Sequence, residues 1–422
     1  MAQVRHSAGI GFLTLLAVVL LLVGVGRGDG VPSVRQAAGG FEQDLVRWEI
    51  SHFMDKWLRQ AVNIALRRSA SASERETAIA EFFDSSGDVR ESQEALTRAL
   101  AAEGGELPRA RDAQRELAKL ESQRAELAPV VEEAIEAAVT DVLSQAGIID
   151  HAGPIRWPPV DFTFTDSALV LVRSPRDKVR RLADLLLEPD VAALEQVAIE
   201  ERVEAENDVS ALVVRVGGIA TYPTQVQPLA SLHRTLELVG HEWLHHWLIF
   251  RPLGRAWFAG GELQSVNETL ANIVGEEIGD LALTKLTGEV VERRPWTPPK
   301  PPSEAASVPG VFDYTREMRR TRTRLDELLA DGTVADAETY LEERRLAFVA
   351  AGYPLRKLNT AWFAFHGTYA DNPASASPIE AQLRAVRADS GSLAEFVDRV
   401  AVIDAGGDLE EIAREAGWEA TG

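Results

Sequence analysis

Cysteine is absent from the 422-residue chain. Disulfide bonds, thiolate metal ligands and a cysteine nucleophile are therefore excluded. The absence does not assign a compartment, because proteins outside the cytoplasm often fold without disulfides.

Basic residues are in short supply as well. Lysine and arginine number 44 against 65 aspartates and glutamates, which gives a formal net charge of −21. Because nucleic-acid phosphates are bound by clustered cations, this balance argues against DNA or RNA as a partner. It predicts a soluble, self-repelling surface. The length allows two domains and a large core, and a hydrophobic content of 45% is ordinary for a globular protein.

Long apolar runs are also scarce, and the one that could span a bilayer lies at residues 10–25, between Arg5 and Arg27. It is apolar on every face, and no Ala-x-Ala cleavage pattern follows it. We therefore expect residues 1–27 to form a single-pass membrane anchor, with the rest of the chain outside the cytoplasm. The alternative is a cleaved signal segment and a secreted protein.

Residues 41–150 have a helical composition. An amphipathic pattern covers residues 48–66, and residues 91–145 are rich in Ala, Glu, Leu, Arg and Gln. Two glycines and a proline within 104–108 predict a break into a helical hairpin or a coiled-coil-like pair. We expect this region to pack beside a catalytic domain or to act as a spacer.

The sequence changes from helical to strand patterns at the start of the predicted core, residues 155–294. A small sheet there could bind an extended peptide, which adds to a sheet edge through main-chain hydrogen bonds. Tyr222 is a candidate substrate-binding residue on that edge; the alternative is a packing role between strands. The β-branched and alternating patterns predict strands at 161–165, 169–172, 211–216 and 219–225.

The most informative pattern is His-Glu-x-x-His, formed by His241, Glu242 and His245. Histidines four residues apart lie on one face of a helix, so both imidazoles can reach one metal ion. Glu242 would project beside that metal, where it can take a proton from water. The apolar neighbours predict a buried helix, and a dry site strengthens the effect of a cation on its ligands. His246 points about 100° away from His245 and is expected to be structural.

A catalytic zinc ion uses three protein ligands and keeps a fourth position open. A second helical pattern follows a glycine-containing loop, and Glu268 lies in it among apolar residues. We predict that Glu268 is the third ligand of one Zn²⁺ per chain. Asn272, one turn further on, is expected to accept the N–H of a liganding imidazole. Glu276 and Glu277 fit a solvated helix face.

The two motifs together, at 241–245 and 267–272, resemble those of the gluzincin metallopeptidases, which include thermolysin-like enzymes. More narrowly, the chain is similar to a bacterial aminopeptidase family. Three further segments, at 218–224, 316–329 and 358–369, are similar to its strand before the metal helix, a later helix and a late helix ending in tyrosine.

This similarity covers roughly residues 160–405. Two features depart from the family's pattern: twenty-two residues, 246–267, separate the motifs, and Asn272 stands where thermolysin-like enzymes carry an aspartate. Neither departure removes a ligand. The resemblance implies a zincin-type domain and zinc-dependent hydrolysis of peptide bonds.

Peptide hydrolysis also needs a donor that steadies the developing oxyanion, usually a tyrosine or a histidine. After a proline-rich linker at 295–310, residues 311–422 are predicted to be the helical C-terminal part of the peptidase domain. His366 and Tyr369 lie in one aromatic-rich turn there. Tyr369 matches the family's tyrosine and ranks first; packing roles stay open for both.

The sequence therefore predicts a mostly helical α+β fold and a membrane-anchored zinc metallopeptidase acting on peptides or proteins. Glu242 would be the general base toward a metal-activated water and would pass the proton to the leaving amine. The alternative is a membrane-tethered helical scaffold with a structural or inactive metal site, where no carboxylate is needed at position 242. Cleavage at free N-termini would require an acidic group for the substrate ammonium, for which Glu262, Glu276 and Glu277 are candidates.

Overall fold

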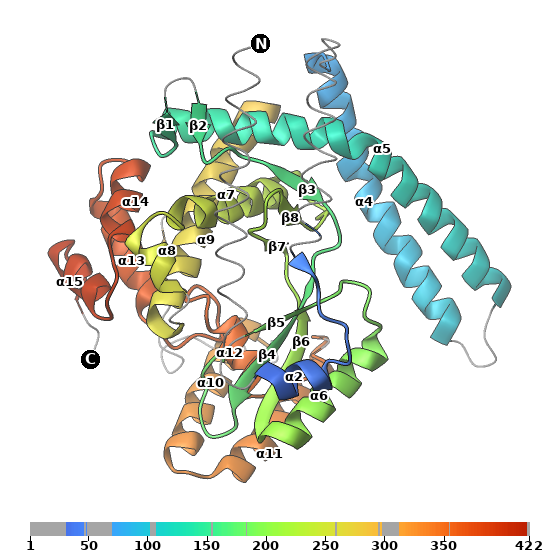
Figure 1. Cartoon of the computed structure of the whole chain (residues 1–422), viewed down its shortest axis with the longest axis vertical. Coiled ribbons are helices and arrows are strands. Elements are labelled where there is room, and N and C mark those ends of the chain that lie inside the picture. Colours follow the sequence, from blue (N-terminus) through green and yellow to red (C-terminus); the bar gives the residue numbers. More distant parts are fainter. Residues whose placement is uncertain are drawn as a thin grey trace.

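Over the residues that it describes, the computed structural model in Figure 1 is mostly helical with three small sheets, which confirms the α+β expectation at this level. The domain limits stay predictions. The structure describes residues 31–45, 48, 70–101, 107–152, 155–182, 184–257, 260–293, 296–297, 312–353 and 355–419.

Three predicted segments lie largely or wholly outside these residues: the apolar run at 10–25, the helical pattern at 48–66 and the linker at 295–310. Within the described ranges, none of the helices combines the length and the apolar character needed to cross a bilayer.

The predicted helical hairpin is present. Helices α4 (Ala72–Ala101) and α5 (Leu107–Ala146) run side by side, and the pair extends well beyond the rest of the molecule (Figure 1). α4 begins earlier than the predicted residue 91, because Ser71 and Glu74 form a reciprocal capping box over its first turn. At the near end, Phe82 stacks on Phe164 with ring centroids 4.6 Å apart. One end of the hairpin therefore belongs to the protein core.

Two three-stranded sheets precede the histidine motif. The strands predicted at 161–165, 169–172 and 211–216 are confirmed, whereas the segment 219–225 contributes to two short strands instead of one. In the first sheet the order is β3 (Phe162–Phe164), β8 (Thr224–Val226) and β7 (Gly218–Ile219), with β3 parallel and β7 antiparallel to β8. In the second, antiparallel sheet the order is β5 (Leu185–Leu187), β4 (Leu169–Pro175) and β6 (Val209–Arg215). A separate hairpin pairs β1 (Asp150–Ala152) with β2 (Ile155–Trp157).

Glutamates from helices close the outer edges of β3 and β6. In α5, Glu136 accepts the N–H of Phe162 at 3.0 Å, and Glu132 accepts the N–H of Phe164 at 2.7 Å. Two glutamates of α6 (Ala193–Asn207) do the same for β6, with N–O distances of 2.6 and 2.9 Å. Edge strands carry N–H groups without a strand partner, so these carboxylates satisfy groups that a further strand would otherwise bind.

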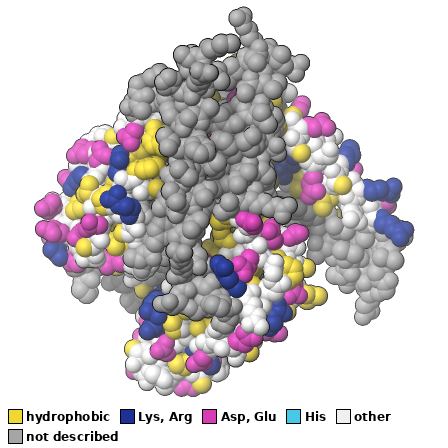
Figure 2. All heavy atoms as spheres, in the orientation of Figure 1, with side chains coloured by type: hydrophobic (Ala, Val, Ile, Leu, Met, Phe, Trp, Pro, Cys, Tyr) yellow, Lys and Arg dark blue, Asp and Glu magenta, His cyan; other side chains and the backbone are white. Residues whose placement is uncertain are grey.

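The second sheet is buried on both faces, because apolar side chains that alternate along its central strand pack into two different clusters. Leu169 and Leu171 face α2 (Val31–Ala37) and α6, whereas Val170 and Val172 face the C-terminal helices. Those helices are α10 (Tyr314–Ala330), α11 (Val334–Ala350) and α12 (Thr360–His366). In Figure 2 acidic and basic side chains are interspersed over the described part of the visible surface.

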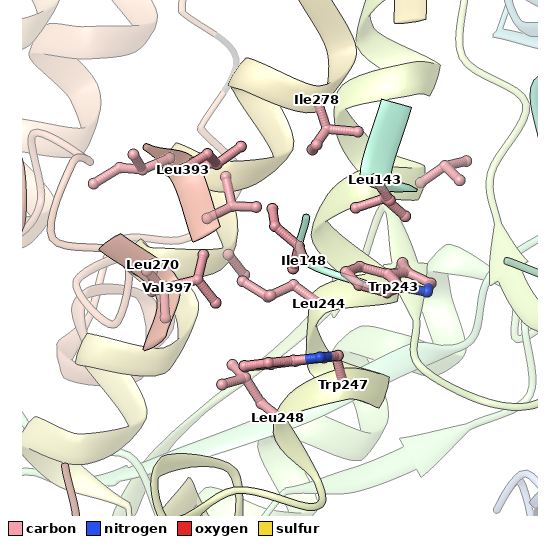
Figure 3. Close-up of a cluster of buried hydrophobic side chains, with 14 of the residues drawn as sticks. Leu143, Ile148, Trp243, Leu244, Trp247, Leu248, Leu270, Ile278, Leu393 and Val397 are labelled. Carbon is pink, nitrogen blue, oxygen red and sulfur yellow. The ribbon is translucent and has the colours of Figure 1, made fainter. Parts of the chain in front are cut away.

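The main core surrounds α7 (Leu232–Leu248) and α9 (Gly261–Thr287), which a short helix, α8 (Pro252–Ala256), connects. α13 (Ile379–Asp389), α14 (Leu393–Ala401) and α15 (Asp408–Glu415) cover one side (Figure 1). The residues that interlock around α7 are labelled in Figure 3: Leu143, Ile148, Trp243, Leu244, Trp247, Leu248, Leu270, Ile278, Leu393 and Val397.

Three glycines allow the backbones of α7 and α9 to touch. A Cβ on Gly275 would lie 2.6 Å from the carbonyl oxygen of Glu237. A Cβ on Gly279 would lie 2.9 Å from the backbone nitrogen of the same glutamate. On α7, a Cβ on Gly240 would lie 3.2 Å from the side chain of Ile278. Larger residues at these positions would separate the two helices.

We predict that Gly275→Ala destabilises the fold, because an added Cβ meets backbone that cannot rotate away. The free energy of unfolding, measured by urea denaturation, should fall by about 1–3 kcal/mol. Gly87→Ala in α4 is the matched control, since a Cβ there meets nothing within 4 Å and alanine is the better helix former. Equal destabilisation of the two variants would contradict the role of the crossing.

Candidate metal centre

Helix α7 presents the two predicted histidine ligands on one face. The helix begins at an N-cap, Ser231, whose hydroxyl accepts the N–H of Arg234. His241 is buried and His245 is half-buried, and their Nε2 atoms lie 3.0 Å apart. Two imidazole nitrogens therefore converge on one point in the interior.

Glu268 of α9 completes the group. Its Oε2 lies 3.5 Å from the Nε2 of His241 and 3.5 Å from that of His245. The three ligand atoms lie within 4.8 Å of one another, so this group could hold a metal ion. The structure thus brings together the three residues that the sequence predicts as ligands.

The chemistry of the donor atoms fits a cation. The amide oxygen of Asn267 lies 2.8 Å from Nδ1 of His245. Since that oxygen only accepts hydrogen bonds, Nδ1 donates to it, and Nε2 is the ring nitrogen that faces the other two residues. Burial lowers the pKa of His245, but Glu268 outweighs this effect and raises it to about 9. Burial raises the pKa of Glu268, but the two imidazoles outweigh this effect and hold it well below its usual value.

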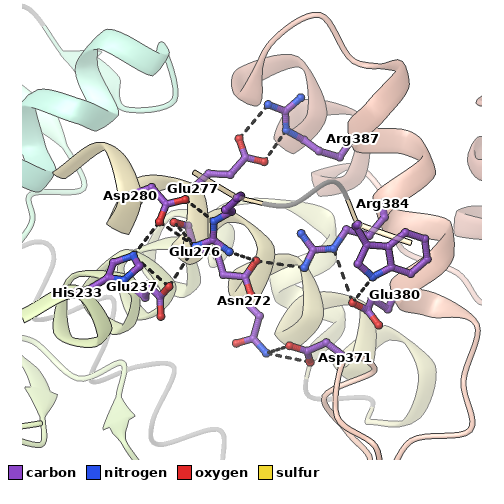
Figure 4. Close-up of polar contacts among 12 residues, drawn as sticks. His233, Glu237, Asn272, Glu276, Glu277, Asp280, Asp371, Glu380, Arg384 and Arg387 are labelled. Atoms are coloured by element: carbon purple, nitrogen blue, oxygen red, sulfur yellow. Dashed lines mark hydrogen bonds and ion pairs between the residues drawn. The ribbon is translucent and has the colours of Figure 1, made fainter. Parts of the chain in front are cut away.

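Asn272 does not have the predicted role. Its Nδ2 donates to both carboxylate oxygens of Asp371, at 3.1 and 3.0 Å (Figure 4), and none of the described imidazoles donates to its amide oxygen. Asn267 provides that contact instead, for His245. The two asparagines lie on different sides of α9. Asn267 faces the histidine helix α7, whereas Asn272 faces Asp371, in the segment after α12.

Trp257 makes a contact to Glu268 that the sequence pattern does not predict. Its indole Nε1 donates to Oε1 of Glu268 at 3.2 Å. This contact occupies one carboxylate oxygen and leaves Oε2 toward the histidines. The tryptophan lies just after α8, and only its position between the two motifs could have suggested it.

Glu242 is buried beside the three candidate ligands and against β7. A Cβ on Gly218 would lie 2.6 Å from its Oε1, so the carboxylate occupies space that the glycine leaves open. Burial raises the pKa of Glu242 above its ordinary value, and His241 and His245 oppose that rise. The acid therefore lies between the histidine helix and the edge strand of the first sheet.

Of the two predicted oxyanion donors, Tyr369 lies near the ligands. Its ring centroid is 6.5 Å from that of His241. Burial raises the pKa of Tyr369 well above its ordinary value, and Glu268 adds to the rise. His366 instead stacks on Trp362 at 4.0 Å, and its Nδ1 lies 2.9 Å from the carbonyl oxygen of Trp362. The packing alternative describes His366.

Tyr222 is not available to a substrate. Its side chain is 1% exposed and lies edge-on to His246, with ring centroids 6.1 Å apart. The packing alternative therefore describes this tyrosine, and its burial does not support a substrate contact. His246 is itself buried, and burial lowers its pKa to about 4, which fits a neutral, structural histidine.

The three acidic residues considered for binding an ammonium group all have partners. Glu276 pairs with two arginines at 2.7 and 3.2 Å, and Glu277 pairs with one at 2.7 Å (Figure 4). Glu262 accepts the N–H of Gly407 at 3.3 Å. Glu276 and Glu277 therefore serve ion pairs between helices and do not form a solvated face.

A second group of potential ligands, formed by His233, Glu237 and Asp280, lies at the other end of the same helix pair. Arg293 pairs with both acids of this group, at 3.1 Å from Glu237; His233, Glu237 and Asp280 are labelled in Figure 4. The guanidinium of Arg293 supplies the positive charge there, and this group serves as an internal comparison for the metal centre.

Comparisons of the chain with protein-family models, with curated proteins and with solved structures gave no match.

We predict that the purified protein binds about one zinc ion per chain. Of the two groups of potential ligands found among the described residues, the one at His233 already holds the guanidinium of Arg293. His245→Ala should abolish stoichiometric binding, whereas His233→Ala in the comparison group should keep it. The measurement is elemental analysis after gel filtration from a zinc-containing buffer. A His245→Ala protein that keeps its zinc would contradict the assignment.

A second prediction separates the two asparagines. Asn267→Ala should weaken zinc affinity about 10–100-fold, the usual effect of losing a hydrogen bond to a liganding imidazole. Asn272→Ala should leave the affinity unchanged, since its amide contacts Asp371. Competition with a chromophoric chelator measures both affinities; the reverse order would restore the original expectation for Asn272.

Proposed function

We propose that this chain is a zinc-dependent peptidase of gluzincin type that hydrolyses peptide bonds with water. One observation carries the proposal: Glu242 is buried beside the group of His241, His245 and Glu268 without being one of its ligands. A structural metal site has no use for a further buried carboxylate, which burial makes costly.

Zinc held by three protein ligands keeps a fourth position open, where it polarises a carbonyl group and lowers the pKa of water. The protein's own part is proton transfer. Because burial raises the pKa of Glu242, its carboxylate is a better proton acceptor than an exposed glutamate. It can take a proton from water and then deliver it to the leaving amine.

Tyr369 is the proposed donor to the developing oxyanion. Its raised pKa keeps the hydroxyl protonated at neutral pH, as a donor requires. It lies beside His241, within electrostatic reach of Glu268 and Glu242. His366 has no part in this proposal, since it packs on Trp362.

The proposed substrate is an extended peptide that lies along β7. This strand ends the first sheet, and the Glu242 carboxylate occupies the space where a side chain of Gly218 would lie. A peptide added to such an edge is held by main-chain hydrogen bonds, largely without regard to its side chains. The arginine partners of Glu276 and Glu277 remove two candidates for ammonium binding and favour cleavage within a chain over cleavage at a free N-terminus.

The cellular setting rests on the sequence alone. We propose that residues 10–25 anchor the chain in a membrane, with the peptidase part outside the cytoplasm. Secretion after cleavage of this segment is the alternative.

The competing proposal is a membrane-tethered scaffold with a structural or inactive metal site. Glu242→Gln distinguishes the two, because it preserves shape and removes the base. We expect zinc to stay bound while hydrolysis of a quenched peptide library falls at least ~10²-fold. Glu277→Gln, the same change on the other ligand-bearing helix, should keep both properties. Loss of zinc from Glu242→Gln would make Glu242 a ligand or a support, and an absence of zinc-dependent hydrolysis in the unmodified protein would favour the scaffold.

A further inference from the structure

The backbone on both sides of Tyr369 is bonded to α9, the helix that carries Glu268. The hydroxyl of Ser265 donates to the carbonyl oxygen of Thr368 at 2.6 Å. The hydroxyl of Thr269 accepts the N–H of Ala370 at 2.9 Å. The tyrosine thus lies between two peptide groups that one helix holds.

A third contact follows one turn further along α9. Asn272 donates to the carboxylate of Asp371 at 3.0 and 3.1 Å (Figure 4). Residues 265, 269 and 272 are spaced by four and three positions, so they form one stripe on the helix surface. We call Ser265, Thr269 and Asn272 the α9 clamp.

Burial makes these contacts persistent. Ser265 is 7% exposed and Thr269 is fully buried, so neither hydroxyl can exchange its partner for bulk water. Breaking either bond would leave a buried backbone group unpaired, which costs more than the bond itself contributes in water. Tyr369 therefore cannot shift along α9 without breaking a buried hydrogen bond.

We propose that the α9 clamp is a set of positioning residues that fixes Tyr369 relative to the ligand Glu268. Glu268 lies between Ser265 and Thr269 in the sequence of the same helix, so the ligand and the tyrosine are set by one rigid element. Tyr369 also lies edge-on to Phe365, with ring centroids 6.2 Å apart, which restricts the ring once the backbone is fixed. The catalytic consequence rests on the proposed function of Tyr369, whereas the positioning itself does not.

Fixed geometry matters because an oxyanion donor acts only at hydrogen-bond distance from the charge that develops. A displacement of about 1 Å can cost a factor of about 10² in rate. Loss of the clamp should therefore lower kcat and leave KM and zinc binding in place, since no clamp residue is a zinc ligand.

The test uses the full-length, zinc-loaded protein with 3-fluorotyrosine at its five tyrosines, observed by fluorine NMR. Tyr369→Phe identifies the resonance of Tyr369. The clamp variants are Ser265→Ala, Thr269→Val and their combination; Thr269→Ser keeps the acceptor. Thr235→Val is the matched control, because that buried threonine bonds only its own helix, at the carbonyl oxygen of Ser231.

We expect the double variant to shift or broaden the Tyr369 resonance while the other four tyrosines and the zinc content stay unchanged. Its kcat should fall about 10-fold or more, with KM unchanged, and should fall no further when Tyr369→Phe is added. Thr269→Ser and Thr235→Val should behave like the unmodified protein.

An unshifted Tyr369 resonance in the zinc-loaded double variant would overturn the proposal. The proposal would also fail if adding Tyr369→Phe to the double variant lowered kcat by the same factor as it does in the unmodified protein. If Tyr369→Phe keeps full activity, the catalytic role of Tyr369 fails, while a shifted resonance still supports the clamp. The spectroscopic result thus decides the positioning separately from the proposed function.

Discussion

The contact between the backbones of α7 and α9 is the constraint on which the rest of the structure depends. It exists because Gly240, Gly275 and Gly279 leave no side chain between the helices. His241 directly follows the first of these glycines, and Glu268 lies about two turns before the second. Ligands from separate helices can therefore meet without long, flexible side chains. The surrounding core of α5, α7, α9 and α14 then keeps the two helices in register.

Local spacing explains which parts of the site were predictable. The histidine pair follows from helix geometry, and Glu268 follows from the need for a third ligand in an apolar segment; both groups of atoms converge as expected. The choice between Asn267 and Asn272 could not be made in this way. These residues lie about 140° apart around a helix, and which of them faces α7 depends on how α9 is rotated in the assembled core.

The same distinction holds for the fold. Strand patterns and the helical hairpin were readable because alternation and helix breakers act over a few residues. Tyr222 was expected on a sheet edge because residues 219–225 have the pattern of one strand. The segment instead divides into β7 and β8, and Tyr222 lies between them, buried against His246. The arginine partners of Glu276 lie 17 and 108 residues away along the chain, so that acid resembles a solvated residue until the helices are packed together.

The glutamates that occupy the edges of β3 and β6 have a consequence for proteostasis. Exposed edges recruit other extended chains, which is how many proteins aggregate or exchange strands. Under the proposed function, extended chains would meet this protein as substrates. Carboxylates at these edges already bind the N–H groups that an incoming strand would need. They also repel acidic segments of an approaching chain, so strand capture and self-association are disfavoured at these two edges.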